Sequence, residues 1–244
     1  MKIIISPAKT FKIRKIKNKN CSCLYESKKN ELVSIIKEKS AEELKKLWKC
    51  SDKIAEESYN LYQNFDEAPK GCAILSFDGI QYQYMDVNSL DEKQLGYLEE
   101  NLRILSGLYG ILRPLDEISK YRLDFEDKLI NLYEFWEDEI RNHFKGEEII
   151  DLASKEYGQN IYKYLDKTPV KIDFKEEVFV EGDIKLKTKA TPSKILRGRM
   201  VNYMARNNVE DIEQLKKFSC DGYNYSEDYS DTNKLVFVKS KVSD

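Results

Sequence analysis

The sequence contains few of the residues on which several common mechanisms depend. Its single histidine, His143, leaves Ser-His and Cys-His nucleophile systems poorly supported. The cysteines are odd in number and include no C-x-x-C pair, which argues against a zinc site and against disulfides. We therefore expect neither a metal site nor a cofactor. The five cysteines are Cys21, Cys23, Cys50, Cys72 and Cys220.

Neither sign of charge dominates, and no long apolar run is present. The formal net charge is −2, from 41 Lys and Arg against 43 Asp and Glu, which excludes a uniformly basic nucleic-acid binder. Any anion site must therefore come from local clustering of cations. No stretch approaches the roughly 18 apolar residues of a membrane span. The opening MKIIISPAKT is interrupted by Pro7 and is too short for a signal peptide. We expect a soluble, reduced, cytoplasmic protein with no membrane partner.

A length of 244 residues with 41% hydrophobic content supports one sizeable core. No internal repeat or polar linker interrupts the chain, so we expect one compact domain over residues 1–244. The pattern predicts an α+β fold in which helices surround a mixed sheet. Strands are predicted at 2–5, 72–77, 148–153, 170–174, 178–180, 184–189 and 235–238, and helices at 31–39, 41–63, 89–105, 131–144, 154–164 and 194–206.

The stretch 101–125, NLRILSGLYGILRPLDEISKYRLDF, combines features of an anion site. Leucines recur at helical spacing up to Leu105, and Gly107 and Gly110 then break the pattern. A short apolar run follows and ends at Pro114. This order predicts a helix, a glycine turn and a second helical piece, with backbone N–H groups available to an anion. Three arginines lie in the same stretch, at Arg103, Arg113 and Arg122.

Further cations cluster outside that stretch. Lys9 lies in the SPAKT loop, before a basic run over residues 12–19 that could either face an anion or protect a sheet edge from aggregation. Ser154 opens a predicted helix, where it could cap the helix or offer an anion site. Gly198, inside the predicted helix 194–206, would permit close approach of another backbone or of a ligand. The remaining cations of interest are Lys185, Lys187, Lys189, Lys194, Arg197, Arg199 and Arg206.

Seven blocks, in order, resemble the YaaA family of peroxide-stress proteins: ISPAKT, LRILSGLYGILRPLD, YRLDF, LYEFW, DLASKEY, LRGRM and DGYNYSED. The resemblance implies a cytoplasmic protein that is produced under hydrogen peroxide stress and limits iron-dependent DNA damage. It also implies a mixed α/β domain that binds DNA through a helix-hairpin-helix-like element and a basic cleft. We place that hairpin at residues 107–110. Lys120, Leu196 and Asn202 depart from the family pattern.

Three functions remain open. The first, which we favour, is a monomeric stress protein that binds DNA through phosphate contacts without turnover. The second is an enzyme acting on a nucleotide or a damaged nucleobase at the same cleft, with Asp116 or Glu156 as the acid. The third is direct iron binding by Glu227, Asp228 and Asp231. We assign no catalytic residues. The expected phosphate-binding residues are Lys9, Arg103, Ser106, Gly107, Tyr109, Gly110, Arg113, Arg122, Ser154, Lys189, Lys194, Arg197 and Arg199.

Overall fold

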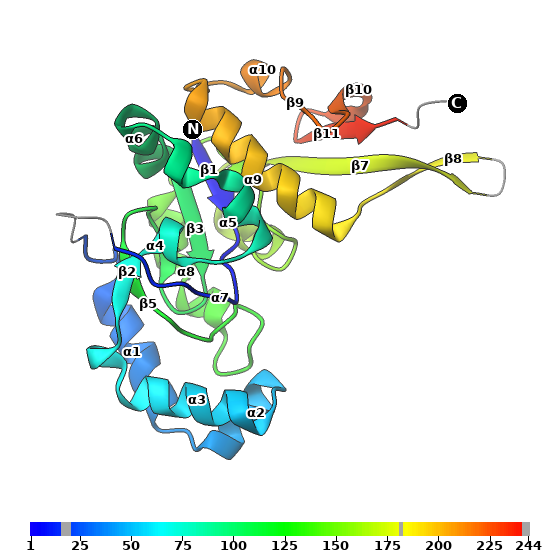
Figure 1. Ribbon diagram of the computed structural model, residues 1–244. Coiled ribbons are helices and arrows are strands. Elements are labelled where there is room, and N and C mark those ends of the chain that lie inside the picture. The colour runs from blue at the N-terminus through cyan, green and yellow to red at the C-terminus, as the bar shows by residue number, and fades with distance from the viewer. Residues whose placement is uncertain (16–20, 181–182, 241–244) are drawn as a thin grey trace.

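The computed structural model describes residues 1–15, 21–180 and 183–240. Its strands are β1 (Lys2–Ile5), β2 (Lys70–Cys72), β3 (Leu102–Ser106), β4 (Gly110–Leu112), β5 (Glu117–Ser119), β6 (Ile149–Asp151), β7 (Val170–Val180), β8 (Asp183–Lys187), β9 (Ser219–Cys220), β10 (Tyr223–Asp231) and β11 (Lys234–Lys239). The larger sheet has the order β4-β3-β1-β6-β7-β11-β10-β9, with β8 paired to β7 (Figure 1). Strands β3, β1, β6, β7 and β11 run parallel to one another, whereas β4, β8 and β10 are antiparallel to their neighbours.

Helices surround this sheet, so the predicted mixed α/β fold is confirmed. The α-helices are α1 (Glu26–Lys37), α2 (Ala41–Trp48), α3 (Asp52–Gln63), α4 (Ala73–Ser76), α5 (Ile80–Met85), α6 (Glu92–Asn101), α7 (Leu132–Phe135), α8 (Glu137–His143), α9 (Ala190–Arg206) and α10 (Ile212–Leu215). Helix α9 packs against α5, α6 and β7, while α1, α2 and α3 lie together at the lower end of Figure 1. No helix among the described residues is both long and apolar enough to cross a membrane.

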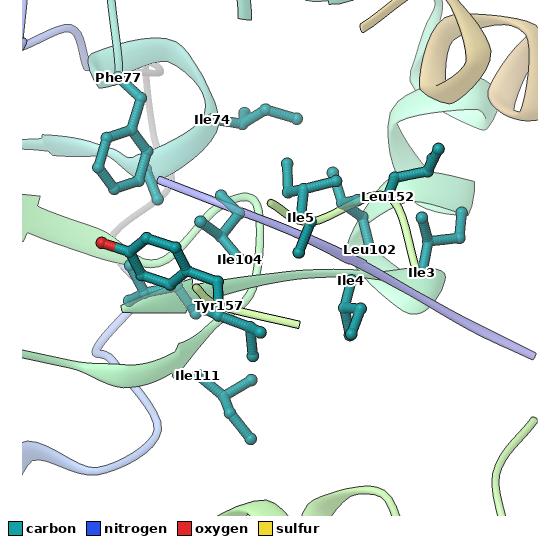
Figure 2. Packing of buried hydrophobic residues seen from close by; sticks show 14 of the residues in the cluster. Ile3, Ile4, Ile5, Ile74, Phe77, Leu102, Ile104, Ile111, Leu152 and Tyr157 are labelled. Atoms are coloured by element: carbon teal, nitrogen blue, oxygen red, sulfur yellow. The ribbon is translucent and has the colours of Figure 1, made fainter. Parts of the chain in front are cut away.

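The core is built around β1, as its continuous apolar run predicts. Ile3, Ile4 and Ile5 are fully buried, because β1 has a parallel strand on each side and packed elements over both faces (Figure 2). Each buried isoleucine contributes about 1.5–3 kcal/mol through removal of its side chain from water. The carboxyl end of β1 is thereby fixed at the centre of the sheet, and the SPAKT loop begins there.

Residues 101–125 correct the sequence prediction. The helix ends at Asn101, and its N-cap is Asp91 rather than Ser89. Leu102 and Leu105 lie in β3, which pairs with β4 across the glycine turn as an antiparallel β-hairpin. The helix-hairpin-helix element that we placed at this turn is therefore not confirmed. Every residue of β3 is buried, including Arg103 and Ser106, so the segment lacks the alternation of apolar and polar residues that separates a strand from a helix.

Other predicted elements differ in extent. The single helix 41–63 is two helices, because Lys49 adopts the left-handed region (φ 46°) and Ser51 caps the second. The capping box of Ser40 and Glu43 is confirmed. The remaining corrections concern five ranges: residues 72–77 form the end of β2 and then α4, 131–144 divide into α7 and α8, 154–164 form a turn and the 3₁₀ helix η3 (Gln159–Tyr164), 170–180 form one strand, and 227–231 belong to β10.

Strands β7 and β8 form an arm that projects from the body (Figure 1). Phe179 and Ile184 lie opposite each other on it, with 65% and 61% of their surfaces exposed. After β8 the chain continues through Lys189 into α9. This helix contains four of the predicted cations, Lys194, Arg197, Arg199 and Arg206. Residues 16–19 of the predicted basic run lie outside the described residues.

Candidate functional site

A cavity of about 350 Å³ lies beyond the carboxyl ends of β1 and β6. From β1 the chain crosses to β3 on one side and later to β6 on the other, so β1 is a point at which the strand order reverses. Open α/β sheets bind their ligands outside the carboxyl ends of strands at such points. The cavity is lined by Ser6, Pro7, Ala8, Lys9, Thr10, Gly79, Ile80, Gln81, Tyr82, Asp124, Ser154, Glu156, Tyr157, Lys194 and Arg197.

Two serines join the loops that follow β1 and β6. Ser6 Oγ accepts a hydrogen bond from the backbone N–H of Ser154 (2.8 Å), and the two hydroxyl oxygens lie 3.0 Å apart. Ser154 Oγ donates to Glu156 Oε1 at 3.3 Å, so the hydroxyl proton of Ser6 points towards Ser154. Tyr82 donates to the backbone oxygen of Ser6 (2.9 Å). These contacts fix two hydroxyl groups on the cavity wall.

Asp124 accepts hydrogen bonds from two neighbours in the cavity. Its carboxylate lies 2.7 Å from Lys9 Nζ and accepts from the Tyr157 hydroxyl at 2.5 Å. The pKa of Lys9 is raised, chiefly by this hydrogen bond to Asp124. Burial is the main reason that the pKa of Tyr157 is raised. At neutral pH, Lys9 is therefore charged and Tyr157 is a neutral donor.

Arg197 and Gln81 bring unpaired donors to the site. Within the part of the chain that the structure describes, Arg197 Nε and Gln81 Nε2 are buried and have no hydrogen-bond partner. Burial lowers the pKa of Arg197, against the opposing charges of Asp151 and Asp173, but a guanidinium keeps its proton in proteins. Buried polar groups in folded proteins are nearly always paired, so these two donors are exceptions, and neither nitrogen has surface open to the cavity.

Asp151 is the last residue of β6 and does not itself line the cavity. It is almost fully buried, accepts from the backbone N–H of Ala153 (2.7 Å) and from the Tyr162 hydroxyl, and has a raised pKa because of burial. Gly158 lies directly against its carboxylate, where an added Cβ would come within 2.4 Å of Oδ2. This close contact leaves no room for a side chain at position 158.

The structure gathers only part of the predicted set. Lys9, Ser154, Lys194 and Arg197 line the cavity. Arg103 does not: its side chain is 7% exposed, its Nε donates to His143 Nε2 (2.8 Å), and it also donates to two backbone oxygens.

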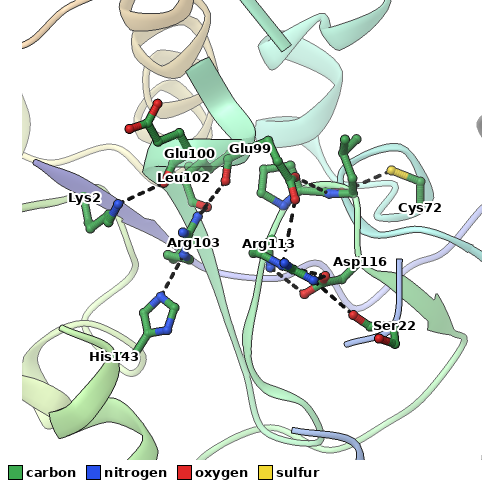
Figure 3. A network of polar contacts seen from close by, with 12 residues as sticks. Lys2, Ser22, Cys72, Glu99, Glu100, Leu102, Arg103, Arg113, Asp116 and His143 are labelled. Carbon is green, nitrogen blue, oxygen red and sulfur yellow. Dashed lines mark hydrogen bonds and ion pairs between the residues drawn. The ribbon is translucent and has the colours of Figure 1, made fainter. Parts of the chain in front are cut away.

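Arg113 is held in the same polar network (Figure 3). Its Nε and NH2 groups donate to Asp116 Oδ1 at 2.9 and 2.7 Å, and its backbone N–H donates to Oδ2. Asp116 is fully buried and lies outside the cavity lining, whereas Glu156, the other candidate acid, is part of that lining.

The predicted residues of the glycine turn hold the β-hairpin together. Ser106 bonds to the Tyr121 hydroxyl (2.7 Å), and the Tyr109 hydroxyl accepts from the backbone of Ser119 (3.0 Å). Trp136 donates to the backbone oxygen of Gly107 (2.9 Å), and its ring lies against Gly110. Residues 107–110 are buried, and the backbone N–H of Tyr109 donates to Ser106 Oγ.

The other predicted cations have different surroundings. Lys189 pairs with Glu176, and Arg199 lies 2.9 Å from both Asp221 Oδ1 and Cys220 Sγ. Arg122 has a buried Nε without a partner among the described residues and does not line the cavity. Glu227, Asp228 and Asp231 lie on β10, and no group of three potential metal ligands is found in the described ranges.

Sequence reasoning missed several cavity residues. Ser6 could have been found, because it follows a buried strand directly. Asp124 lies in the motif YRLDF, but nothing in its spacing along the chain distinguished it from a surface carboxylate. Tyr157 ends the block DLASKEY, but nothing in the sequence placed its side chain in a cavity. Gln81 carries no signal in the sequence, since only the packing of distant segments brings it to the cavity.

His143 lies beneath Arg103 and gives a testable pH dependence. Its Nε2 accepts from Arg103, so the neutral ring carries its proton on Nδ1, 3.4 Å from the Tyr25 hydroxyl. Burial, together with Arg103 and Lys2, lowers the pKa of His143 from 6.5 to about 4, and Glu147 opposes this shift. The unfolded chain therefore binds the proton more readily. The stability contributed by the neutral ring is present above pH about 6.5 and is lost as the pH falls towards 4.

We expect His143→Gln to flatten this loss. In the native chain the free energy of unfolding should fall by on the order of 2–3 kcal/mol through this group between pH 7 and 4. Urea unfolding of both chains over that range measures the difference, and other acidic groups cancel in the comparison. Parallel curves for the two chains would show that His143 does not titrate in this way. Glutamine keeps an acceptor for Arg103, which protects the fold of the variant.

The fold and the cavity define a class: a mixed α/β protein with cations and hydroxyls gathered at the carboxyl ends of its parallel strands. The family is equally definite. A family model described as peroxide stress protein YaaA matches residues 1–229, and the chain belongs to that family. It is 84% identical over 244 residues to a UPF0246 protein of Finegoldia magna, with 100% of both chains covered. UPF0246 proteins of Agathobacter rectalis (41% identical; 98% of this chain and 99% of the relative) and Pediococcus pentosaceus (39%; 99% of each) are also similar.

Proposed function

We propose that the chain acts in peroxide stress by binding DNA, without regard to sequence, at the cavity beyond β1 and β6. The observation that carries this proposal is the convergence of Arg197, Lys194 and Lys9 with the hydroxyls of Ser6 and Ser154. Arginine, lysine and serine are the side chains that most often contact phosphate oxygens, and such contacts position a protein on DNA without reading its bases. The membership in a peroxide-stress family supports the biological setting.

We further propose that this binding limits iron-dependent DNA damage. Ferrous iron bound to DNA phosphates reduces hydrogen peroxide where it is bound, which yields ferric iron, hydroxide and a hydroxyl radical. Cationic side chains on the same phosphates release condensed counterions, and iron held in that way leaves with them. Protection then comes from occupying the phosphates, and a monomer of the chain suffices for it.

The test is the salt dependence of DNA affinity in a chain carrying both Lys194→Gln and Arg197→Gln. Removing two phosphate contacts should reduce the slope of log affinity against log salt by about 2. The expected slope for Arg199→Gln is that of the native chain, because Arg199 is on the same helix but engages Asp221. Nicking of plasmid DNA by Fe²⁺ and peroxide should be suppressed by the native chain and by Arg199→Gln, and much less by the double variant.

An unchanged slope in the double variant would remove the cavity from the proposed interface. Thermal melting must accompany the binding measurement, since Arg197 is largely buried and its loss could affect folding. Lys194→Gln alone changes an exposed side chain, and it should lower the slope by about 1 without altering the melting temperature.

A second candidate function is an enzyme acting on a nucleotide or a damaged nucleobase in the same cavity. Asp124 favours it, because a carboxylate bonded to a charged lysine and a neutral tyrosine could exchange a proton with a substrate. Glu156, which accepts from Ser154, is a second carboxylate within reach. Turnover of nucleotides or damaged DNA, with and without divalent metal, would favour this function. Loss of turnover in Asp124→Asn would assign the reaction to the cavity.

A further inference from the structure

The arm formed by β7 and β8 carries two neighbouring apolar side chains in water. Phe179 and Ile184 lie directly opposite each other in the antiparallel pair, so they point to the same face. Both are more exposed than the other large hydrophobic side chains of the described ranges. Single exposed apolar residues are ordinary, whereas adjacent ones on a projecting element are typical of a binding surface. We call Phe179 and Ile184 the arm tip.

Cations lie on the opposite face of the arm. Lys185 and Lys187 alternate with Ile184 along β8, so they point away from the face that carries the arm tip. Both side chains are exposed, and neither forms an ion pair with another described residue. Glu176, which lies opposite Lys187, is already paired with Lys189. The two lysines are therefore available to a polyanion.

The arm is continuous with the cavity at which we place DNA. Strand β8 leads into α9 at Ala190, and Lys194 lines the cavity about one turn further on (Figure 1). The extended residues from Ile184 to Ala190 and this turn of helix together span at most about 26 Å. That length corresponds to about eight base-pair steps of about 3.4 Å. A duplex bound at the cavity therefore passes within reach of the arm tip.

A two-stranded ribbon with apolar side chains near its end has a shape suited to bending DNA. The grooves of a duplex admit such a ribbon. Proteins that bend DNA insert an apolar side chain, often Phe or Ile, between two base pairs, which partly unstacks them and kinks the duplex. Phe179 and Ile184 are side chains of this kind, and the lysines on the other face can reach phosphates beside the groove.

We propose that the arm lies along a groove of DNA bound at the cavity, and that Phe179 and Ile184 insert between two base pairs and kink the duplex. Lys185 and Lys187 hold the phosphates beside that groove. This inference rests on the proposed DNA binding and adds that the bound duplex is bent. It requires no chemical step.

Two other occupants of the arm tip fit the charges less well. Glu177 and Asp183 lie close to the tip, and the anionic headgroups of a membrane surface would repel them, whereas between base pairs the tip meets uncharged bases. Pairing of β8 with a second copy of the chain is opposed by Lys185 and Lys187, since lysines on an exposed edge strand discourage such pairing.

The experiment measures energy transfer between fluorophores at the two ends of a duplex of about 20 base pairs. The native chain should raise the transfer, because a kink of about 20–90° brings the ends closer. Phe179→Ser with Ile184→Ser should leave the transfer as in free DNA. This arm-tip variant should bind about tenfold more weakly but with the native salt slope, because it loses apolar contacts and keeps its phosphate contacts. Its melting temperature should be that of the native chain, since both side chains are exposed.

Two more variants complete the comparison. Ile54→Ser is the matched control, because Ile54 is an exposed isoleucine on α3, far from the arm in Figure 1, and this variant should bend DNA as the native chain does. Lys185→Gln with Lys187→Gln should lower the slope of log affinity against log salt by about 2. An unchanged slope in that variant would place the arm away from DNA and overturn the inference.

The remaining outcomes separate this inference from the proposed function. Absence of any salt-sensitive binding by the native chain would overturn both. Salt-sensitive binding without a rise in energy transfer would overturn the inference alone, and so would a rise that survives in the arm-tip variant. Sedimentation of the free chain, and of the chain with phosphatidylserine–phosphatidylcholine vesicles, tests the other occupants. Dimers or vesicle binding that disappear in the arm-tip variant, together with an unbent duplex, would assign the tip to a second copy or to a membrane and overturn the inference.

Discussion

Replacement of Gly198 by alanine should lower the free energy of unfolding by about 1–2 kcal/mol, which is the overpacking cost less the gain in helix propensity. An alanine Cβ here would come within 2.2 Å of the backbone oxygen of Gln81 and 2.9 Å of the backbone nitrogen of Met85. Both atoms belong to α5 and cannot rotate away, so the two helices must separate. Overpacking of this kind costs about 1–3 kcal/mol and occasionally more, which exceeds the gain of about 1 kcal/mol from alanine in a helix.

Gly96→Ala is the matched control for this prediction. Gly96 lies within α6, and nothing comes within 4 Å of the Cβ it would acquire. There the helix propensity of alanine acts alone, so the variant should be more stable by about 0.5–1 kcal/mol. Urea unfolding of both variants gives the comparison. Two variants of equal stability would show that α5 and α9 are not in the close contact described.

The sequence was sufficient for the centre of the fold and for the family. A run of isoleucines bounded by proline identifies β1, and Ser40 with Glu43 identifies the start of α2, because both signals are local. It was insufficient where a segment is buried on all sides. Residues 102–106 have no polar face that would reveal the two-residue period of a strand. The helical spacing of the leucines in α6 happens to continue to Leu102 and Leu105, so the pattern predicted a longer helix.

For the site, local signals identified the cations but not their neighbours. Whether an arginine is available depends on carboxylates elsewhere in the structure: Arg113 is bonded to Asp116, whereas Arg197 lines the cavity and its Nε has no partner among the described residues. Spacing along the chain carries little information on such pairings when they are made in three dimensions. The prediction that Gly198 permits a close approach was correct in kind, because it concerned only the missing Cβ, and the structure identifies the neighbour as the backbone of α5.

Asp116→Ala is expected to destabilise the chain by about 3 kcal/mol. Asp116 is fully buried and accepts from the backbone N–H of Arg113 and from two nitrogens of its guanidinium. Breaking a buried ion pair by removing one partner costs about 3–5 kcal/mol, and the lower figure applies because Arg113 is 33% exposed and keeps some hydration. Glu99, 3.8 Å from Arg113, replaces only part of the lost interaction. Urea unfolding at neutral pH measures the loss.

Two further variants decide whether the loss comes from the unpaired charge. Burial raises the pKa of Asp116 despite Arg113, so the pair does not fully offset its own desolvation. Replacing both partners, by Arg113→Met with Asp116→Leu, should therefore recover much of the stability lost in Asp116→Ala. Glu137→Ala, which breaks the exposed pair with Arg141 on α8, should cost only about 0.3–0.5 kcal/mol. If Asp116→Ala cost no more than Glu137→Ala, the network in Figure 3 would not be holding the segment after β4 in place.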